Sequence, residues 1–179
     1  MFNFLKKKKE EPKVIENKDT LIYSVANGTF IGMENVEDEM FSQKILGDGY
    51  AVMPEDRDVY SPVRGTVKSI FPTKHALCIV SDQGDEIILH MGIDTVSLNG
   101  VPFNILVSEG QTIEASTKVA EIDLNYLKEN NINSSLIVVF SNVDSISEII
   151  YSKTGSLKAT EIVGQVVHNY AHEEIIVDK

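Results

Sequence analysis

The segment from residue 73 to residue 96 constrains the fold of this chain more than any other, because it predicts a β-hairpin and holds two of the four histidines. Residues 76–80 and 87–89 are rich in aliphatic and β-branched side chains and are predicted strands. The sequence Ser-Asp-Gln-Gly between them is typical of a β-turn, with serine first and glycine fourth. The segment therefore indicates two antiparallel strands joined by a tight turn.

The register of this hairpin decides which side chains lie together. If Asp82 and Gln83 are the two central residues of the turn, His75 lies directly opposite His90. Facing side chains on an antiparallel pair have Cβ atoms about 4.5–5.5 Å apart, so the two imidazoles would share one patch. A bulge at the turn would shift this pairing. The predicted outer face also carries Thr73, Leu77, Ile79, Ile88, Gly92 and Asp94, and the predicted core face carries Ala76, Cys78, Val80, Ile87, Leu89 and Met91.

Two facing imidazoles can bind a metal, act as general acid and base, carry a phosphoryl group, or form a purely structural pair. The neighbours favour phosphoryl transfer, which depends on positioning and on stabilising the phosphoryl oxygens. The hydroxyl group of Thr73 can orient His75. Gly92 frees a carbonyl that can hold one ring nitrogen of His90 as a donor. Asp94, the candidate third metal ligand, lies two pairs beyond His90, so no permanent metal site is predicted.

The composition narrows the class of protein and its partners. A net charge of −11 at pH 7 argues against nucleic acid, whose phosphates would be repelled over most of the surface. The single cysteine, Cys78, excludes an internal disulfide and a multi-cysteine zinc site, and we expect it to be a small buried side chain. No apolar run approaches the roughly 20 residues that span a bilayer, and no secretory signal is present. We therefore expect a cytoplasmic protein.

The two ends of the chain are predicted tails. Residues 1–20 begin with an apolar pentapeptide followed by four lysines, which predicts a flexible tail with at most weak membrane-surface contact through residues 1–9. Near the other end, His168 and His172 are four residues apart and would face the same way on a helix. A third metal ligand is missing there, so a solvated tail is favoured over a metal site.

Between the tails, short β-like runs alternate with turn residues and predict an all-β fold. A weak internal repeat indicates two copies of one strand–turn–strand unit: Tyr23, Ser24, Gly28 and Thr29 recur as Tyr60, Ser61, Gly65 and Thr66. The continuous apolar run 135–140 predicts a buried central strand. Short helical turns are expected at residues 40–46, 124–130 and 143–151. The fold class is therefore an antiparallel β-sandwich with a few short helical turns.

Four blocks of the sequence resemble one known family. Residues 84–96, Gly-Asp-Glu-Ile-Ile-Leu-His-Met-Gly-Ile-Asp-Thr-Val, are similar to the signature of the glucose-type enzyme IIA of the bacterial phosphoenolpyruvate-dependent sugar phosphotransferase system. Residues 73–76, 41–49 and 60–66 resemble other blocks of the same family. The resemblance covers residues 21–163, which is most of the chain.

This resemblance implies a compact antiparallel β-sandwich, a barrel-sandwich hybrid, that works as a phosphoryl carrier. It implies that His90 accepts a phosphoryl group from the phosphohistidine of the phosphocarrier protein HPr. The group then passes to a cysteine of the enzyme IIB domain of a sugar permease, with a glucose-type permease favoured. His75 would support transfer, Thr73 would orient His75, and Asp94 would lie beside the site. The implied docking rim is apolar and consists of Met40, Phe41, Ile45, Leu46, Phe71, Ile88 and Val96.

The expected organisation is a tail at 1–20, an enzyme IIA domain at 21–163 and an extension at 164–179, in a free-standing, monomeric subunit. Phosphoryl transfer needs no resident cofactor. One alternative is a non-catalytic regulatory module, in which His75 and His90 bind zinc only when a partner supplies a carboxylate. Another is a zinc hydrolase, which would need a third protein ligand near the two histidines. The sequence does not identify the sugar.

Overall fold

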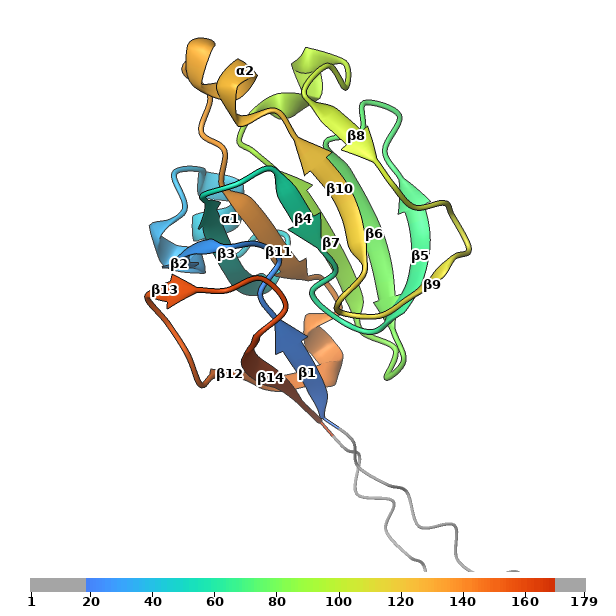
Figure 1. Ribbon diagram of the computed structural model, residues 1–179. Coiled ribbons are helices and arrows are strands. Elements are labelled where there is room, and N and C mark those ends of the chain that lie inside the picture. The colour runs from blue at the N-terminus through green and yellow to red at the C-terminus, as the bar shows by residue number, and fades with distance from the viewer. Residues whose placement is uncertain (1–18, 170–179) are drawn as a thin grey trace, which may run out of the picture.

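The computed structural model describes residues 19–169 of the 179-residue chain, and this part folds into an antiparallel β-sandwich (Figure 1). The strands are β1 (Thr20–Tyr23), β2 (Gly28–Gly32), β3 (Asp48–Pro54), β4 (Asp58–Tyr60), β5 (Gly65–Ile70), β6 (Ala76–Ser81), β7 (Glu86–Met91), β8 (Phe103–Ile105), β9 (Thr112–Ile113), β10 (Lys118–Ile122), β11 (Leu136–Phe140), β12 (Ile146–Tyr151), β13 (Ser156–Leu157) and β14 (Ile162–His168). The helices are α1 (Glu39–Ser42) and α2 (Leu124–Glu129), with 3-10 turns η1 (Met33–Asn35), η2 (Thr95–Leu98) and η3 (Val143–Ser145).

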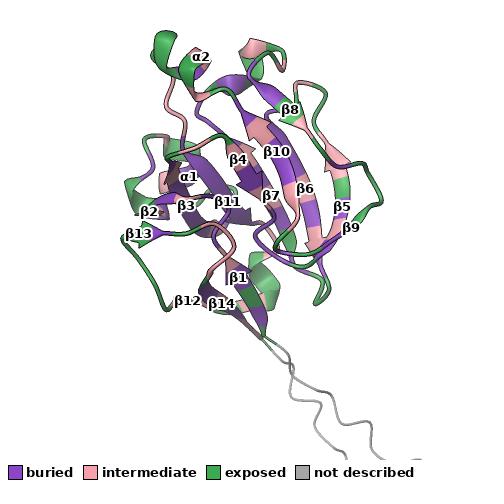
Figure 2. Cartoon of the chain, viewed as in Figure 1, coloured by how far each residue is buried: buried purple, intermediate pink, exposed green. Residues whose placement is uncertain are grey.

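Three antiparallel sheets build the sandwich. The large sheet has the order β13-β2-β3-β11-β7-β6-β5-β9, and β4-β10-β8 lies over it, while β1-β14-β12 forms the third sheet. The main core fills the space between the large sheet and β4-β10-β8, where the strands are mostly buried (Figure 2). A second core cluster covers the other face of β3 and β11. Because β11 is covered on both faces, all five of its residues are buried, as the apolar run predicts.

The internal repeat is a structural repeat. In each copy a strand, a turn and a second strand follow one another, and the end of each first strand donates a backbone hydrogen bond to the turn of the other copy. The Tyr23 N–H donates to the carbonyl of Pro62 at 2.8 Å. The Tyr60 N–H donates to the carbonyl of Val25, also at 2.8 Å. The serine after each tyrosine donates its hydroxyl to the carbonyl two residues further on. The two units thus hold each other at the centre of the sandwich.

The expected helix at residues 143–151 is wrong. Only η3 is helical there, and the chain continues as strand β12, which pairs with β14. Ile146, Ile149 and Ile150 are β-branched and favour a strand. Their exposure alternates irregularly because β12 is an edge strand, so the sequence lacked a clear period of two. The helical turns expected at 40–46 and 124–130 are observed as α1 and α2.

The folded domain extends further towards the C-terminus than predicted. Strand β14 continues to His168, so the domain boundary at residue 163 is too early. The first strand, β1, pairs with β14 and holds the two ends of the described chain together. The lysine-rich tail and His172 lie outside the described residues. Within residues 19–169, no helix is long and apolar enough to cross a membrane.

His168 does not lie in a solvated tail, because it belongs to a buried polar cluster around Asp85. The Asp85 side chain is fully buried, and its Oδ1 lies 2.7 Å from Nε2 of His168. Its Oδ2 accepts hydrogen bonds from the hydroxyls of Ser81, at 2.7 Å, and Thr20. The cluster therefore ties β1 and β14 to the turn between β6 and β7.

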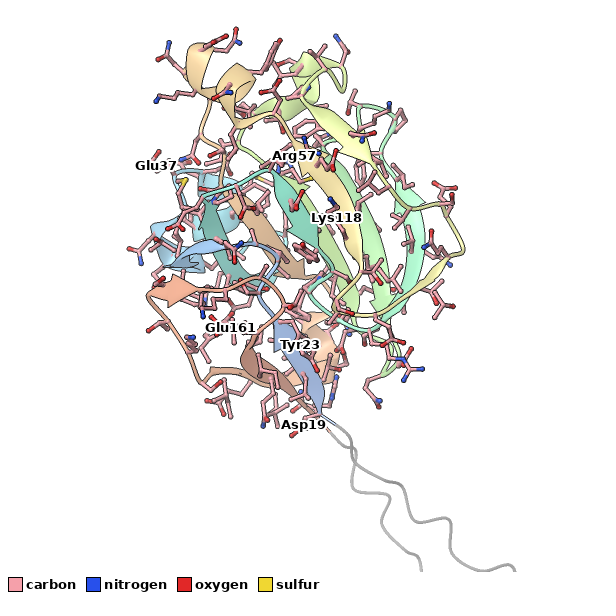
Figure 3. The ribbon with its side chains drawn as sticks, viewed as in Figure 1. Asp19, Tyr23, Glu37, Arg57, Lys118 and Glu161 are labelled. Atoms are coloured by element: carbon pink, nitrogen blue, oxygen red, sulfur yellow. The ribbon has the colours of Figure 1, made fainter. Side chains whose placement is uncertain are left out.

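A charged network lies on the smaller sheet, where Figure 3 shows Arg57, which directly precedes β4, near Lys118 at the start of β10. Lys118 lies 3.1 Å from both Asp58 and Glu121, and Arg57 lies 2.7 Å from Glu121. Hydrogen bonds from Lys118, Asn104 and Arg57 lower the pKa of Glu121 to about 2. Since Arg57 is exposed, the other members are only partly buried, and all are paired with one another, the network is a solvated surface of the fold.

Candidate functional site

The hairpin that carries the two histidines has a three-residue turn, so the predicted register is wrong by one residue. The Ser81 N–H donates to the carbonyl of Asp85 at 2.9 Å, which leaves residues 82–84 as the loop. Gly84 ends this loop with a φ of 93°, a conformation that glycine adopts without strain. As a result Ala76, and not His75, pairs with His90.

This shift reverses the two faces of β6. Leu77 and Ile79 point into the main core and are fully buried, whereas the outer-facing Cys78 is only half-buried. The expectation that Cys78 is buried, and that the two aliphatic residues lie beside the histidines, is therefore wrong. The prediction for β7 is right: Ile87, Leu89 and Met91 are buried in the core, and Ile88 and His90 are on the outer face.

His75 and His90 nevertheless meet. His75 lies just before β6, so its side chain does not have to follow the alternation of side chains between the two faces of the strand. The preceding residue, Lys74, has a left-handed backbone with a φ of 57°. The His75 carbonyl accepts a hydrogen bond from the Met91 N–H at 2.8 Å, which anchors the segment to β7. The two imidazole rings lie edge to face with centroids 5.1 Å apart. The two histidines are therefore in contact even though the register differs from the predicted one by one residue.

His90 is a neutral, partly buried imidazole. Burial, and to a smaller extent the neighbouring His75, lower its pKa to about 4. The Gly92 backbone and the carboxyl groups of Asp38 and Asp94 act in the opposite direction but do not restore the ordinary pKa. The Gly92 backbone makes a weak hydrogen-bond contact with the ring, but the buried Nδ1 of His90 has no partner at full hydrogen-bond geometry. The nitrogen that remains accessible for chemistry is therefore Nε2.

His75 is held by Thr73. The Thr73 hydroxyl lies 2.6 Å from Nδ1 of His75, and burial lowers the pKa of this histidine as well. A neutral imidazole carries one N–H donor and one lone pair. When Thr73 donates to Nδ1, the proton of His75 is on Nε2, where it can donate to an oxygen near His90. The pair can therefore combine a nucleophile with a hydrogen-bond donor.

Two phenylalanines extend the histidine pair into a row of four rings. The Phe41 ring lies edge to face with His90, at a centroid distance of 5.1 Å. The Phe71 ring lies edge to face with His75, at 5.2 Å. Phe41 belongs to the second core cluster, whereas Phe71 is 38% exposed. The row thus runs from the protein interior to its surface.

Most of the predicted docking rim is exposed apolar surface. Five of its members are between 38% and 59% exposed: Met40, Ile45, Leu46, Phe71 and Val96. Ile88 is half-buried on the outer face of β7. Phe41 is only 6% exposed and therefore does not belong to an exposed rim. Large apolar side chains that remain exposed around a reactive group indicate a surface that contacts other proteins.

Two carboxylates act on His90, and the sequence analysis identified one of them. Asp94 is an exposed residue with a left-handed backbone, at the start of η2. Asp38, which the sequence analysis missed, caps α1 by accepting from the N–H groups of Met40 and Phe41. An aspartate directly before a helical turn is the pattern of an N-cap, and that signal could have indicated it.

The described residues contain no group of three or more histidine, cysteine, aspartate or glutamate side chains placed to hold a metal ion. His75 and His90 supply two nitrogen ligands at most. A zinc hydrolase needs three protein ligands, so the site does not fit that class. What the fold and the site define is a β-sandwich with a pair of neutral, contacting histidines surrounded by exposed apolar side chains, a class suited to passing a phosphoryl group between proteins.

The comparisons with known proteins identify the family. Residues 20–146 match the model of the phosphoenolpyruvate-dependent sugar phosphotransferase system, EIIA 1. The chain belongs to this family, and it is a phosphotransferase component of the sugar phosphotransferase system.

Three similar proteins illustrate the relationship. Over 145 residues the chain is 46% identical to the PTS system glucose-specific EIICBA component of Streptococcus pneumoniae serotype 4; the match covers 81% of this chain but only 20% of that protein. It is 34% identical to the PTS system glucose-specific EIIA component of Staphylococcus aureus strain COL, with 85% of this chain and 92% of that protein covered. The structure matches glucose permease IIA from Mycoplasma capricolum with a TM-score of 0.72 at 35% identity, over 83% of this chain and 96% of that chain. The chain thus spans about a fifth of the EIICBA relative and nearly all of the single-domain relatives.

Proposed function

We propose that His90 is the phosphoryl acceptor, which takes the group from phospho-HPr and passes it to the cysteine of an enzyme IIB domain. The observation that carries this proposal is the contact between two neutral histidines, of which His90 has its accessible nitrogen, Nε2, on an apolar docking surface. A nucleophile needs a free lone pair, and the low pKa of His90 keeps it available at neutral pH.

The proposed transfer is an in-line displacement at phosphorus. The Nε2 lone pair of His90 forms the new N–P bond while the N–P bond to the donor histidine of HPr breaks, and that histidine keeps the bonding electron pair. In the second step the IIB thiolate forms an S–P bond and the N–P bond to His90 breaks. In both steps His75, oriented by Thr73, donates a hydrogen bond to a phosphoryl oxygen.

The partner assignments rest on the surface and on the relatives. The rim residues can bury apolar area against HPr and IIB in turn, and Asp38 and Asp94 add negative charge beside the histidines. The EIICBA relatives join parts named C, B and A in one protein, which supports a IIB domain as a partner. The names of several relatives favour a glucose-type permease. We also propose a cytoplasmic location, because phosphoenolpyruvate, the phosphoryl source in the family's description, is a cytoplasmic metabolite.

The transfer itself uses no cofactor, but the histidine pair has a second possible ligand. Two imidazoles can bind zinc when a partner adds a carboxylate to complete the coordination. Equilibrium dialysis should then detect no tight zinc binding by the protein alone. Zinc bound at His75 and His90 without a partner would contradict this.

Phosphorylation with radiolabelled phosphoenolpyruvate, enzyme I and HPr tests the proposed function. We expect an acid-labile phosphate on the wild-type protein and complete loss of label in His90→Ala. The His75→Gln variant should still accept the label but pass it to IIB about 100-fold more slowly, because the flexible glutamine amide places its donor less accurately on the phosphoryl oxygens than the imidazole does. Normal labelling of His90→Ala would show that the acceptor is a different residue.

A further inference from the structure

Phe41 differs from the apolar residues around it because its ring points into the protein. It is 6% exposed, whereas the adjacent Met40 on α1 is 45% exposed. The Phe41 ring packs in the second core cluster and also contacts the His90 ring, at a centroid distance of 5.1 Å and an interplanar angle of 63°. A docked partner can therefore reach little of this ring, whereas the ring can fix the orientation of His90.

His90 depends on such packing in addition to its backbone contact with Gly92, because that contact does not reach full hydrogen-bond geometry at Nδ1. Its buried Nδ1 has no hydrogen-bond partner. Instead the imidazole lies between two rings, Phe41 and His75, each of which it meets edge to face. Aromatic contacts of this kind have a preferred geometry in addition to the area that they bury. The rotation of His90 is therefore limited by ring packing.

Asp38 in turn fixes Phe41. Helix α1 has four residues, and the Asp38 side chain accepts hydrogen bonds from the N–H groups of Met40, at 2.8 Å, and Phe41, at 3.4 Å. A helix this short has few hydrogen bonds of its own, so the cap carries much of its order. The cap thus acts directly on the backbone of the residue that touches His90.

We propose, building on the phosphoryl-carrier function above, that Phe41 is the positioning residue for His90 and that Asp38 acts through Phe41 by capping α1. Phe41 keeps Nε2 of His90 aligned with the incoming phosphorus. The same helix presents Met40 to the partner. One four-residue element thus connects the docking surface to the orientation of the reactive ring.

The Phe41→Leu variant tests the positioning role in steady-state transfer from phospho-HPr to IIB. We expect kcat to fall about tenfold while KM changes less than about twofold, because in-line attack tolerates little misplacement. The matched control is Phe103→Leu, which removes a ring of similar burial on β8, in the main core. It should lose comparable stability but keep kcat. A Phe41→Leu protein with full kcat, or with a change in KM alone, would overturn the proposal.

Two variants of Asp38 separate capping from charge. Asp38→Asn keeps an oxygen acceptor for the cap, whereas Asp38→Ala removes it, and both remove the negative charge. We expect Asp38→Ala to reproduce the tenfold loss of kcat and Asp38→Asn to retain most of kcat. Histidine NMR should show the pKa of His90 falling in both. An equal loss of kcat in both variants would mean that Asp38 acts through its charge. Failure of the proposed function would instead appear as wild-type protein that takes no label.

Discussion

His90 and His168 are both partly buried, but the protein satisfies their ring nitrogens in opposite ways. His168 lies 2.7 Å from a carboxyl oxygen of Asp85, and the other Asp85 oxygen accepts two hydroxyl hydrogen bonds. His90 has a buried Nδ1 without a hydrogen-bond partner and is surrounded by the rings of Phe41 and His75. The first environment is polar and satisfied, and the second is mostly apolar.

The difference shows how one hairpin serves two purposes. Asp85 lies at the turn between β6 and β7, where its cluster joins segments that are far apart in the sequence. His90 is near the other end of β7, beside the start of β6. A satisfied buried polar cluster gives stability and a unique arrangement of strands. An imidazole kept neutral and without a partner at its accessible nitrogen keeps the lone pair that transfer chemistry needs.

Among the variants that test this comparison, removal of the Asp85 carboxyl group should have the largest effect on stability. Asp85→Ala leaves three donors without their shared acceptor in a buried site, so we expect the free energy of unfolding to fall by about 3–5 kcal/mol in urea denaturation. Asp82→Ala is the control, since this neighbouring aspartate is exposed in its ion pair with Arg64, and its loss should cost at most about 1 kcal/mol. If the two variants lose equal stability, the Asp85 cluster is not a structural centre.

The pH dependence of stability tests the apolar environment of His90. Between the ordinary histidine pKa of about 6.5 and the folded value of about 4, the unfolded chain binds a proton at position 90 that the folded protein does not. Stability is therefore lost as pH falls, and the contribution of His90 between pH 7 and pH 5 is about 2 kcal/mol. Urea unfolding of wild-type protein and His90→Gln at both pH values should show a smaller loss in the variant. The same loss in both would contradict the low pKa.

The smallest expected effect concerns the contact between the Thr73 hydroxyl and His75. Thr73→Val preserves the shape of the side chain but removes the hydroxyl that lies 2.6 Å from Nδ1 of His75. We expect transfer to IIB to slow by about fivefold to tenfold, which corresponds to one hydrogen bond of roughly 1 kcal/mol. Thr66→Val, on strand β5, is the matched control and should leave the rate unchanged. Equal rates for Thr73→Val and wild type would mean that ring packing alone orients His75.

Prediction from the sequence is correct where a local pattern matches the final environment. The apolar run of β11 predicted a buried central strand, and the two strand–turn–strand units were visible as a repeat. It fails where a distant segment decides the outcome. Residues 146–151 became an edge strand through pairing with β14, and His168 entered a cluster with Asp85 that lies far away in the sequence. Neither contact leaves a signal within its own segment.

The sequence by itself determined the class of fold, the hairpin, the family and the two histidines that meet. These follow from strand periodicity, turn residues and a long motif, all of which are local. Only the tertiary structure decided the register of the hairpin, the burial of Phe41 and the division of the histidines into a reactive pair and a structural cluster. The physical reason is that the pKa and the hydrogen-bond partners of a histidine depend on burial and on neighbours from other strands, which a linear sequence does not specify.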